Sequence, residues 1–359
     1  MFKSTLDQEA IYNKLDTYQV YSSILGLKNQ VDQTWVEVSH SSLKNELIGI
    51  KDICVCGMGG SALGGRIIRS LDQYILNLPL EVITNYRLPN YVNENSLVIL
   101  VSYSGSTEET LSAALDAINR NAKVYIVTTG GKLLDFAREK NLDHYVIDPK
   151  HNPSGMPRLG LGYSIIAIFA LLARFKFINF TQNDIDQVID VLNQSQINFG
   201  KEKPQKENPA KLFAEKVKDK GIILVSANHL TGTIHAIKNM FNENAKTFAV
   251  NFDLPELNHH FLEGLNNPKA LKEDLFVLFF NSDLYPSVIK KRLLITRNML
   301  ERLGFQTMTI KPESSHPTLQ AFECLSFGEF SSYYLAIINN TNPGPIPSVD
   351  YFKKELSRI

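Results

Sequence analysis

The sequence predicts an α/β protein with two doubly wound units, each a parallel sheet flanked by helices. The first observation is a regular alternation of short apolar runs with amphipathic segments of helical length from residue 53 onward. The second is that a charged, proline-containing stretch near residue 200 interrupts this alternation, which then resumes at residue 221. The third is length, because 359 residues are enough for two domains that each bury a core.

Charge and composition exclude several classes of protein. Lysine plus arginine and aspartate plus glutamate each total 37, so no global field draws the chain to nucleic acid or to a membrane. The N-terminus has no apolar signal core, and no apolar run approaches the length of a membrane span. We therefore expect a cytoplasmic protein.

The three cysteines are Cys54, Cys56 and Cys324. Cys54 and Cys56 alternate along a predicted strand and point to one face, with no second pair or histidine cluster at ligand spacing. We interpret them as small buried core residues rather than as a metal site. A sparse, odd number of cysteines also fits a reducing compartment.

The first unit begins after about 50 residues that look mostly helical and that we expect to lie across this unit. Its predicted strands are Ile53–Cys56, Leu80–Thr84, Leu97–Ser102, Lys123–Thr128 and His144–Ile147. Helices are predicted after the first, third and fourth strands. In such sheets ligands lie outside the carboxyl ends of the strands, so the loops at 57–61 and 102–107 can converge on one crevice.

A largely apolar helix, roughly Gly162–Phe177, and a polar helix ending near Gln196 follow the first sheet. The charged stretch Gly200–Pro209 then favours a linker. We accordingly divide the chain into residues 1–196, a linker at 197–210, and residues 211–359.

The second unit shows the same alternation. Its predicted strands are Gly221–Ser226, Thr247–Val250, Leu275–Phe280 and Thr307–Ile310, and its predicted helices are Thr231–Phe241, Pro286–Leu303 and Leu319–Ile338. The first of these strands is followed by Ser226-Ala-Asn-His229 in place of a glycine-rich loop. We therefore do not expect this unit to bind phosphate through a glycine-rich loop.

The loop Gly57-Met-Gly59-Gly60-Ser61 is the strongest local signal for a ligand. Glycine lets the main chain approach a ligand closely, and the helix that starts near Ser61 offers unpaired N–H groups to an anion, most simply a phosphate. A dinucleotide-binding loop would require an acid after the next strand, where Asn85-Tyr-Arg87 stands. When this loop is considered by itself, a glycine turn that only permits close helix packing remains an alternative to a ligand site.

A second loop, Ser102-Tyr-Ser104-Gly-Ser106-Thr107, places four hydroxyls around one glycine at a strand-to-helix turn. Ser106 with Glu109 matches a capping box, which explains only some of these hydroxyls. Together with Ser61, the others can surround a phosphate with neutral donors. The sequence contains no nucleotide-hydrolysing P-loop.

These two loops resemble the sugar isomerase (SIS) domain, a sugar-phosphate-binding module. Three further stretches make the chain similar to the bifunctional phosphoglucose/phosphomannose isomerase family over residues 50–354. They are Pro157-Arg158, Phe241-Asn-Glu243-Asn-Ala-Lys246 and Pro255-Glu-Leu-Asn258-His259-His260. The family's last stretch usually reads Asn-His-Asn, so His260 is a departure that places a second imidazole beside His259.

The resemblance implies an aldose–ketose isomerase that interconverts glucose 6-phosphate, and also mannose 6-phosphate, with fructose 6-phosphate through a cis-enediolate. It implies Glu243 as the base, His259 in ring opening across a homodimer interface, and Arg158 as fixed positive charge for the enediolate oxygens. A C-terminal lysine also belongs to such a site, and its register favours Lys353 with Lys354 not excluded. The implied phosphate-binding residues are Gly60, Ser61, Ser102, Ser104 and Thr107. No cofactor and no metal are expected, because the pathway only relays a proton.

Other interpretations stay open from the residues alone. Glu243 can be a solvent-exposed carboxylate at a helix end, His259 a loop histidine, and Arg158 a helix cap. Lys353 can be an exposed helix lysine. Two rival functions follow, an isomerase for another sugar phosphate and a non-catalytic sugar-phosphate sensor. A DNA-binding sensor is disfavoured, because residues 1–50 are acidic on balance.

Overall fold

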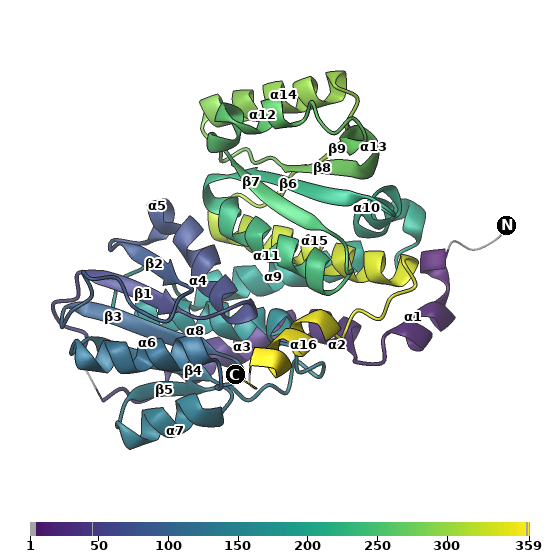
Figure 1. Cartoon of the computed structure of the whole chain (residues 1–359). Coiled ribbons are helices and arrows are strands. Elements are labelled where there is room, and N and C mark those ends of the chain that lie inside the picture. Colours follow the sequence, from purple (N-terminus) through teal and green to yellow (C-terminus); the bar gives the residue numbers. More distant parts are fainter. Residues whose placement is uncertain (1–4, 45, 357, 359) are drawn as a thin grey trace.

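Two parallel sheets organise the chain, and the computed structural model describes residues 5–44, 46–356 and 358. The central strands are continuous apolar runs, as the sequence predicts, because strands covered on both faces exclude polar side chains. The strand predicted at Thr247–Val250 lies at Ala249–Leu254 instead, and this strand and the one at Gln306–Ile310 contain polar residues. Figure 1 shows the two sheets in separate bodies, with long helices packed between them. The predicted fold class is therefore confirmed.

The first sheet has the strand order β2-β1-β3-β4-β5, and all its pairings are parallel. Its strands are β1 (Asp52–Cys56), β2 (Leu80–Ile83), β3 (Ser96–Ser102), β4 (Lys123–Thr128) and β5 (Asp143–Val146). The strand order reverses at β1, so the loops after β1 and β3 flank one crevice at the carboxyl edge of the sheet. The crevice lies where the sequence predicts a ligand.

The helices of this body are α4 (Gly60–Ser70), α5 (Asp72–Ile75), α6 (Glu108–Asn119) and α7 (Gly131–Glu139). Alternate residues along the strands of this sheet face two different apolar cores. Val55 and Ile99 belong to the core shared with α4, whereas Cys54 and Cys56 belong to the core shared with α6 and α7. All three cysteines are buried and free, which confirms their interpretation as core residues.

The second sheet has the order β7-β6-β8-β9 and is also parallel throughout. Its strands are β6 (Gly221–Ala227), β7 (Ala249–Leu254), β8 (Leu275–Phe280) and β9 (Gln306–Ile310). The surrounding helices are α10 (Pro209–Lys216), α11 (Thr231–Glu243), α12 (Phe261–Gly264), α13 (Leu271–Asp274), α14 (Ser287–Arg302) and α15 (Pro317–Ile338), with short 3₁₀ turns η4 (Asn228–Leu230) and η5 (Glu256–His259).

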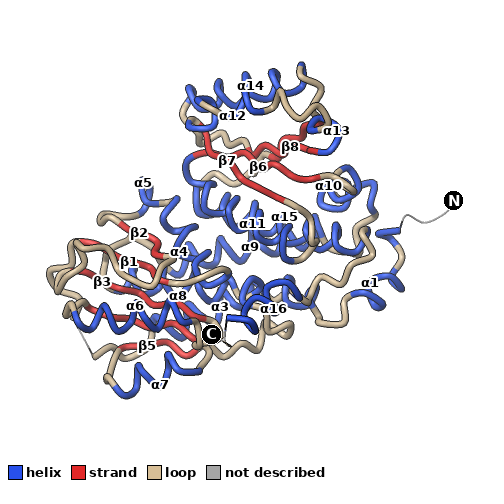
Figure 2. The backbone as a smooth tube through the Cα atoms, in the orientation of Figure 1, coloured by secondary structure: helices blue, strands red, loops and turns tan. Residues whose placement is uncertain are grey.

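A layer of helices separates the two sheets, as Figure 2 shows by the blue tubes between the two sets of red strands. It contains α8 (Leu161–Arg174) and α9 (Gln182–Phe199), which follow the 3₁₀ turn η2 (Pro157–Leu159), together with α11 and α15. Helix α15 is buried along nearly its whole length. No described helix combines the length and apolar composition that a membrane crossing needs.

The N-terminal helices do not all lie across the first unit, so that expectation is wrong in part. Helix α3 (Leu27–Ser39) does pack along α8. The preceding elements η1 (Thr5–Asp7), α1 (Glu9–Leu15) and α2 (Val20–Leu25) contact α15 of the second half instead. The reason is an aromatic cluster, in which Tyr12 stacks on Tyr333 with ring centroids 5.9 Å apart.

Residues 197–210, predicted to be a linker, hold the end of α9, the 3₁₀ turn η3 (Gln205–Glu207) and the start of α10. Asn208 is the N-cap of α10, and its side-chain oxygen accepts hydrogen bonds from the main-chain N–H groups of Ala210 and Lys211. Its side-chain amide donates to the carbonyls of Phe199 and Gly200. The segment is therefore ordered by its own polar groups.

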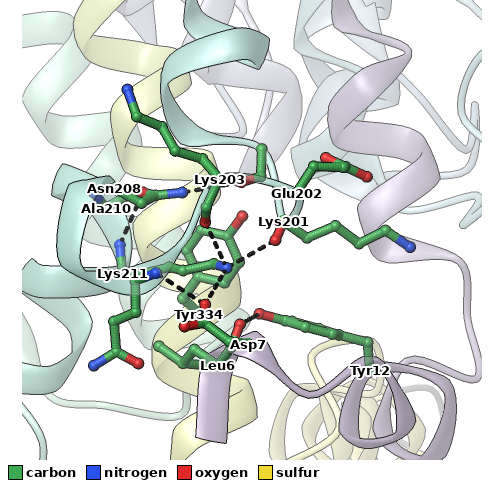
Figure 3. Close-up of polar contacts among 12 residues, drawn as sticks. Leu6, Asp7, Tyr12, Lys201, Glu202, Lys203, Asn208, Ala210, Lys211 and Tyr334 are labelled. Carbon is green, nitrogen blue, oxygen red and sulfur yellow. Dashed lines mark hydrogen bonds and ion pairs between the residues drawn. The ribbon is translucent and has the colours of Figure 1, made fainter. Parts of the chain in front are cut away.

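The side chain of Lys211 is fully buried beside this turn (Figure 3). Its ammonium donates to the carbonyl oxygens of Lys201 at 2.8 Å and Lys203 at 2.9 Å, and lies 3.0 Å from the Asp7 carboxylate. It also lies 5.6 Å from the ring centroid of Tyr334 on α15. One cation thus joins the N-terminal segment, the turn after α9 and the second half of the chain.

We predict that Lys211→Met lowers the free energy of unfolding by about 2–4 kcal/mol, because two buried carbonyls and one carboxylate lose their donor. Chemical denaturation monitored by circular dichroism measures the loss. Lys206→Met is the matched control, since Lys206 is an exposed lysine in a surface ion pair of the same segment and its loss is worth at most about 0.5 kcal/mol. Equal losses in the two variants would contradict the assigned role of Lys211.

Candidate active site

The glycine loop after β1 brings the main chain of the first unit against η2. Gly59 has φ +51, a left-handed conformation that glycine adopts without strain, and α4 begins at the next residue. A Cβ on Gly60 would lie 2.8 Å from the main-chain nitrogen of Arg158. Gly60 is therefore required for close contact between the start of α4 and the segment that carries Arg158.

The hydroxyls of the two loops form one connected group at the crevice. The Oγ of Ser61 accepts a hydrogen bond from the main-chain N–H of Tyr103 at 3.0 Å, so the loops after β1 and β3 are joined directly. The hydroxyls of Ser102 and Thr107 lie 3.0 Å apart. Ser61 and Ser102 are buried, whereas Ser104 is exposed at the rim.

The capping box expected of Ser106 and Glu109 does not form. Helix α6 begins one residue later, with Thr107 as its N-cap, and no side chain caps it. The hydroxyl of Thr107 is instead paired with that of Ser102. These hydroxyls are therefore arranged around the crevice rather than used to start the helix.

Arg158 is the central charged group of the site, and only 2% of it is exposed. Its Nε donates to the Asn244 side-chain oxygen at 2.6 Å. Its Nη2 donates to the carbonyl oxygens of Pro343 at 2.9 Å and Gly344 at 2.7 Å. The guanidinium does not cap α8, so that alternative for Arg158 is wrong.

Glu243 is the last residue of α11, and one of its carboxylate oxygens lies 3.5 Å from Nη1 of Arg158. Its side chain is 26% exposed, so it is neither free in solvent nor sealed from a ligand. Burial raises the pKa of Glu243, and nearby cations oppose that rise. The opposing charges, in decreasing order, are Arg158, Lys353, Lys246 and Lys238.

Comparison with known proteins decides the family. Residues 46–174 match the model of the SIS domain, and residues 206–356 match the model of the bacterial phospho-glucose isomerase C-terminal SIS domain. The chain is 30% identical to the bifunctional phosphoglucose/phosphomannose isomerase of Caldicellulosiruptor bescii over 95% of this chain and 99% of that one. The chain belongs to the bifunctional phosphoglucose/phosphomannose isomerase family. The family predicted from the motifs is thereby confirmed.

Two further similarities agree with this assignment. A bifunctional phosphoglucose/phosphomannose isomerase of Aquifex aeolicus is 29% identical over 95% of this chain and 99% of its own length. A solved structure of a hypothetical protein from Thermus thermophilus superposes with a TM-score of 0.73 over 94% of this chain and 90% of that one, at 16% identity. The structural likeness supports the fold alone.

The C-terminal residues reach this isomerase-family site through α16 (Pro347–Leu356), a helix that the sequence analysis did not anticipate. The charge of Lys353 on α16 acts on Glu243, and that of Asp350 acts on Arg158. Helix α16 has no buried residue, so its position depends on the loop that precedes it. The tail of the chain therefore returns to the neighbourhood of Glu243, and Lys353 is one of the cations that act on this carboxylate.

His259 lies in the second unit, in the turn that follows β7. It lies in η5, is exposed, and its side chain makes no hydrogen bond, ion pair or ring contact within the described residues. The neighbouring Asn258 is fixed instead, because its amide donates to Thr296 on α14 at 2.7 Å. The ring centroid of His260 lies 6.2 Å from that of Phe252.

Sequence reasoning missed Asn244 and the carbonyls of Pro343 and Gly344, which fix the Arg158 guanidinium. Asn244 is fully buried, and it also donates to the hydroxyl of Ser332 at 3.1 Å. The position next to Glu243 in a family motif was the available signal for Asn244. Main-chain carbonyls leave no comparable signal in a sequence.

A cavity of about 440 Å³ lies elsewhere, between α9, the end of β9 and the start of α15. Phe199, Cys324 and Phe327 contribute to its lining. None of the predicted site residues lines it. The residues of the family motifs therefore lie outside this cavity.

We predict that Gly60→Ala lowers the free energy of unfolding by about 1–3 kcal/mol, because the new Cβ meets main-chain atoms of Pro157 and Arg158 that cannot rotate away. Thermal and chemical denaturation measure the change. Gly264→Ala is the control, since a Cβ there has no neighbour within 4 Å. If the two alanine variants are equally stable, the close contact at Gly60 is not a constraint on the fold.

Proposed function

We propose that the chain is an aldose–ketose isomerase that interconverts glucose 6-phosphate, and also mannose 6-phosphate, with fructose 6-phosphate through a cis-enediolate. The observation that carries this proposal is the pairing of the half-buried Glu243 carboxylate with the buried Arg158 guanidinium beside the phosphate-type loop. A site that only binds a sugar phosphate has no use for such a pair. Proton transfer and charge stabilisation require both groups.

The phosphate is assigned to the crevice of the first unit. The N-terminus of α4 carries a partial positive charge that favours an anion, with Gly60 and Ser61 at its first turn. Ser102, Ser104 and Thr107 supply hydroxyls from the other side of the same crevice. This placement leaves the sugar carbons to extend toward η2 and the end of α11.

Glu243 is assigned as the base that moves a proton between C1 and C2. Burial raises the pKa of the carboxylate and makes it more basic than one in water, while the neighbouring cations act in the opposite direction and favour its ionised form. The proton taken from one carbon is returned to the other, so the reaction consumes no oxidant, reductant or cofactor.

Arg158 is assigned as the fixed charge that stabilises the enediolate. Its Nε and Nη2 are already held by Asn244 and by main-chain carbonyls, so only Nη1 is directed to the Glu243 side of the site. Such a guanidinium needs no reorganisation as negative charge develops on the substrate oxygens. Lys353, an exposed residue of α16, adds a second positive charge near the same carboxylate.

Ring opening is assigned to His259 of a partner subunit in a homodimer. Its exposure and the absence of a side-chain partner for it within the described residues support this assignment, because an exposed imidazole can serve a neighbouring subunit. Phosphate, base and acid then come from two chains, and each site is complete only in the dimer.

The first experiment incubates the protein with fructose 6-phosphate in deuterated water and follows the products by NMR. We expect glucose 6-phosphate with deuterium at C2, and mannose 6-phosphate in addition. Glu243→Gln should lower the turnover by at least about a thousandfold while the sugar phosphate still binds. Glu139→Gln, a change at an exposed carboxylate on α7, is the control that should keep full turnover. Sugar-phosphate binding without product or deuterium exchange in the wild type would establish the sensor instead.

The shared site is tested by mixing two inactive variants. Glu243→Gln and His259→Ala should each be inactive alone as homodimers, but a mixed dimer contains one site with an intact glutamate and an intact histidine. After unfolding and refolding of an equal mixture, about a quarter of the wild-type sites should be complete. A mixture with no activity above that of the single variants would place His259 outside the partner's site.

A further inference from the structure

The turn that follows Glu243 ends in a lysine with an unusual main-chain conformation. Lys246 has φ +51, and the N–H of the next residue, Thr247, donates to the carbonyl of Phe241 in the last turn of α11. Glycine is the usual residue at such a left-handed position, and a residue with a Cβ costs about 1 kcal/mol more there. The side chain of Lys246 therefore needs an explanation beyond the turn itself.

The contacts of the Lys246 ammonium explain why a lysine stands at this position, because they connect the turn to the loop before α16. The ammonium donates to the carbonyl of Asn342 at 2.7 Å and to that of Asn244 at 3.2 Å. Arg158 holds the next two carbonyls of the same loop, those of Pro343 and Gly344. Two cations that flank Glu243 thus bind three consecutive main-chain oxygens of one loop.

This loop determines where α16 lies. Helix α16 follows it directly and has no buried residue, so the attachment of residues 342–344 carries much of the helix's placement. Lys353 and Asp350 on α16 act on Glu243 and Arg158 respectively. Displacement of the loop would therefore remove the Lys353 charge from the base.

We propose that Lys246 is a positioning residue of the isomerase reaction, which fastens the loop at 342–344 and with it the α16 lysine beside Glu243. This inference rests on the proposed function of the site. Lys246 itself adds a positive charge near the carboxylate. Partial burial and the Arg158 charge lower the pKa of Lys246 to about 8, while Glu243 opposes that change.

Three variants separate this role from a structural one. Lys246→Gly removes the side chain but relieves the left-handed strain, so it should be at least as stable as the wild type. Lys246→Met removes the charge and keeps the length. Lys246→Arg keeps a cation that can reach the carbonyls. The matched control is Lys176→Gly, since Lys176 has φ +59 after α8, is exposed, and lies outside the site.

We expect Lys246→Gly and Lys246→Met to lower kcat for fructose 6-phosphate by about tenfold to a hundredfold, with little change in KM, because the phosphate loops are untouched. The acid limb of the pH profile of kcat should move to higher pH, since loss of a cation raises the pKa of Glu243 and protonates it earlier as pH falls. Lys246→Arg should restore most of the rate, and Lys176→Gly should match the wild type.

The outcomes discriminate this inference from the proposed function. An inactive wild-type protein would refute the isomerase itself. A wild-type protein that is active, with Lys246→Gly and Lys246→Met equal to it in kcat and in pH profile, would refute the role of Lys246 alone. A stable Lys246→Gly variant with low kcat and a shifted acid limb would support it, because a structural role predicts neither change.

Discussion

The buried guanidinium of Arg158 is the constraint on which the rest of the site depends. A buried cation must have its hydrogen bonds satisfied, and Arg158 obtains them from Asn244 and from the loop before α16. Its own main chain packs against Gly60. One side chain therefore fixes the first unit, the second unit and the C-terminal loop relative to one another, and Glu243 lies where they meet.

Direct packing of α4 against α11 sets the distance between the phosphate-type loop and Glu243. A Cβ on Gly232 of α11 would lie 2.1 Å from the main-chain oxygen of Arg66 on α4, so these two helices touch through their backbones. One of them begins at the phosphate-type loop, and the other ends at Glu243. The separation of the phosphate-type loop from Glu243 is thus built into the core and does not depend on a flexible loop.

The sequence predicted the sheets well and the supporting contacts poorly, for physical reasons. Continuous apolar runs such as Leu275–Phe280 have few alternatives to a buried parallel strand, and the structure has the same bounds. The site motifs were also recognisable, because the chemistry of their side chains can be read directly from the sequence. Main-chain carbonyls at 343 and 344, the exposed helix α16 and the packing of α1 on α15 depend on tertiary contacts, which no local pattern encodes.

The hydroxyls of the crevice have a consequence for the ionisation of the ligand. The oxygens of Ser61 and Ser102 already accept main-chain hydrogen bonds from Tyr103 and Gly105, and one hydroxyl of the Ser102–Thr107 pair donates to the other. The proton of Ser61 and one proton of that pair therefore remain to be donated to a ligand. Hydrogen-bond donors stabilise an ionised phosphate oxygen more than a neutral P–OH group. For the proposed phosphate ligand, the crevice therefore favours the dianion of a phosphate monoester, whose second pKa is about 6, over the monoanion.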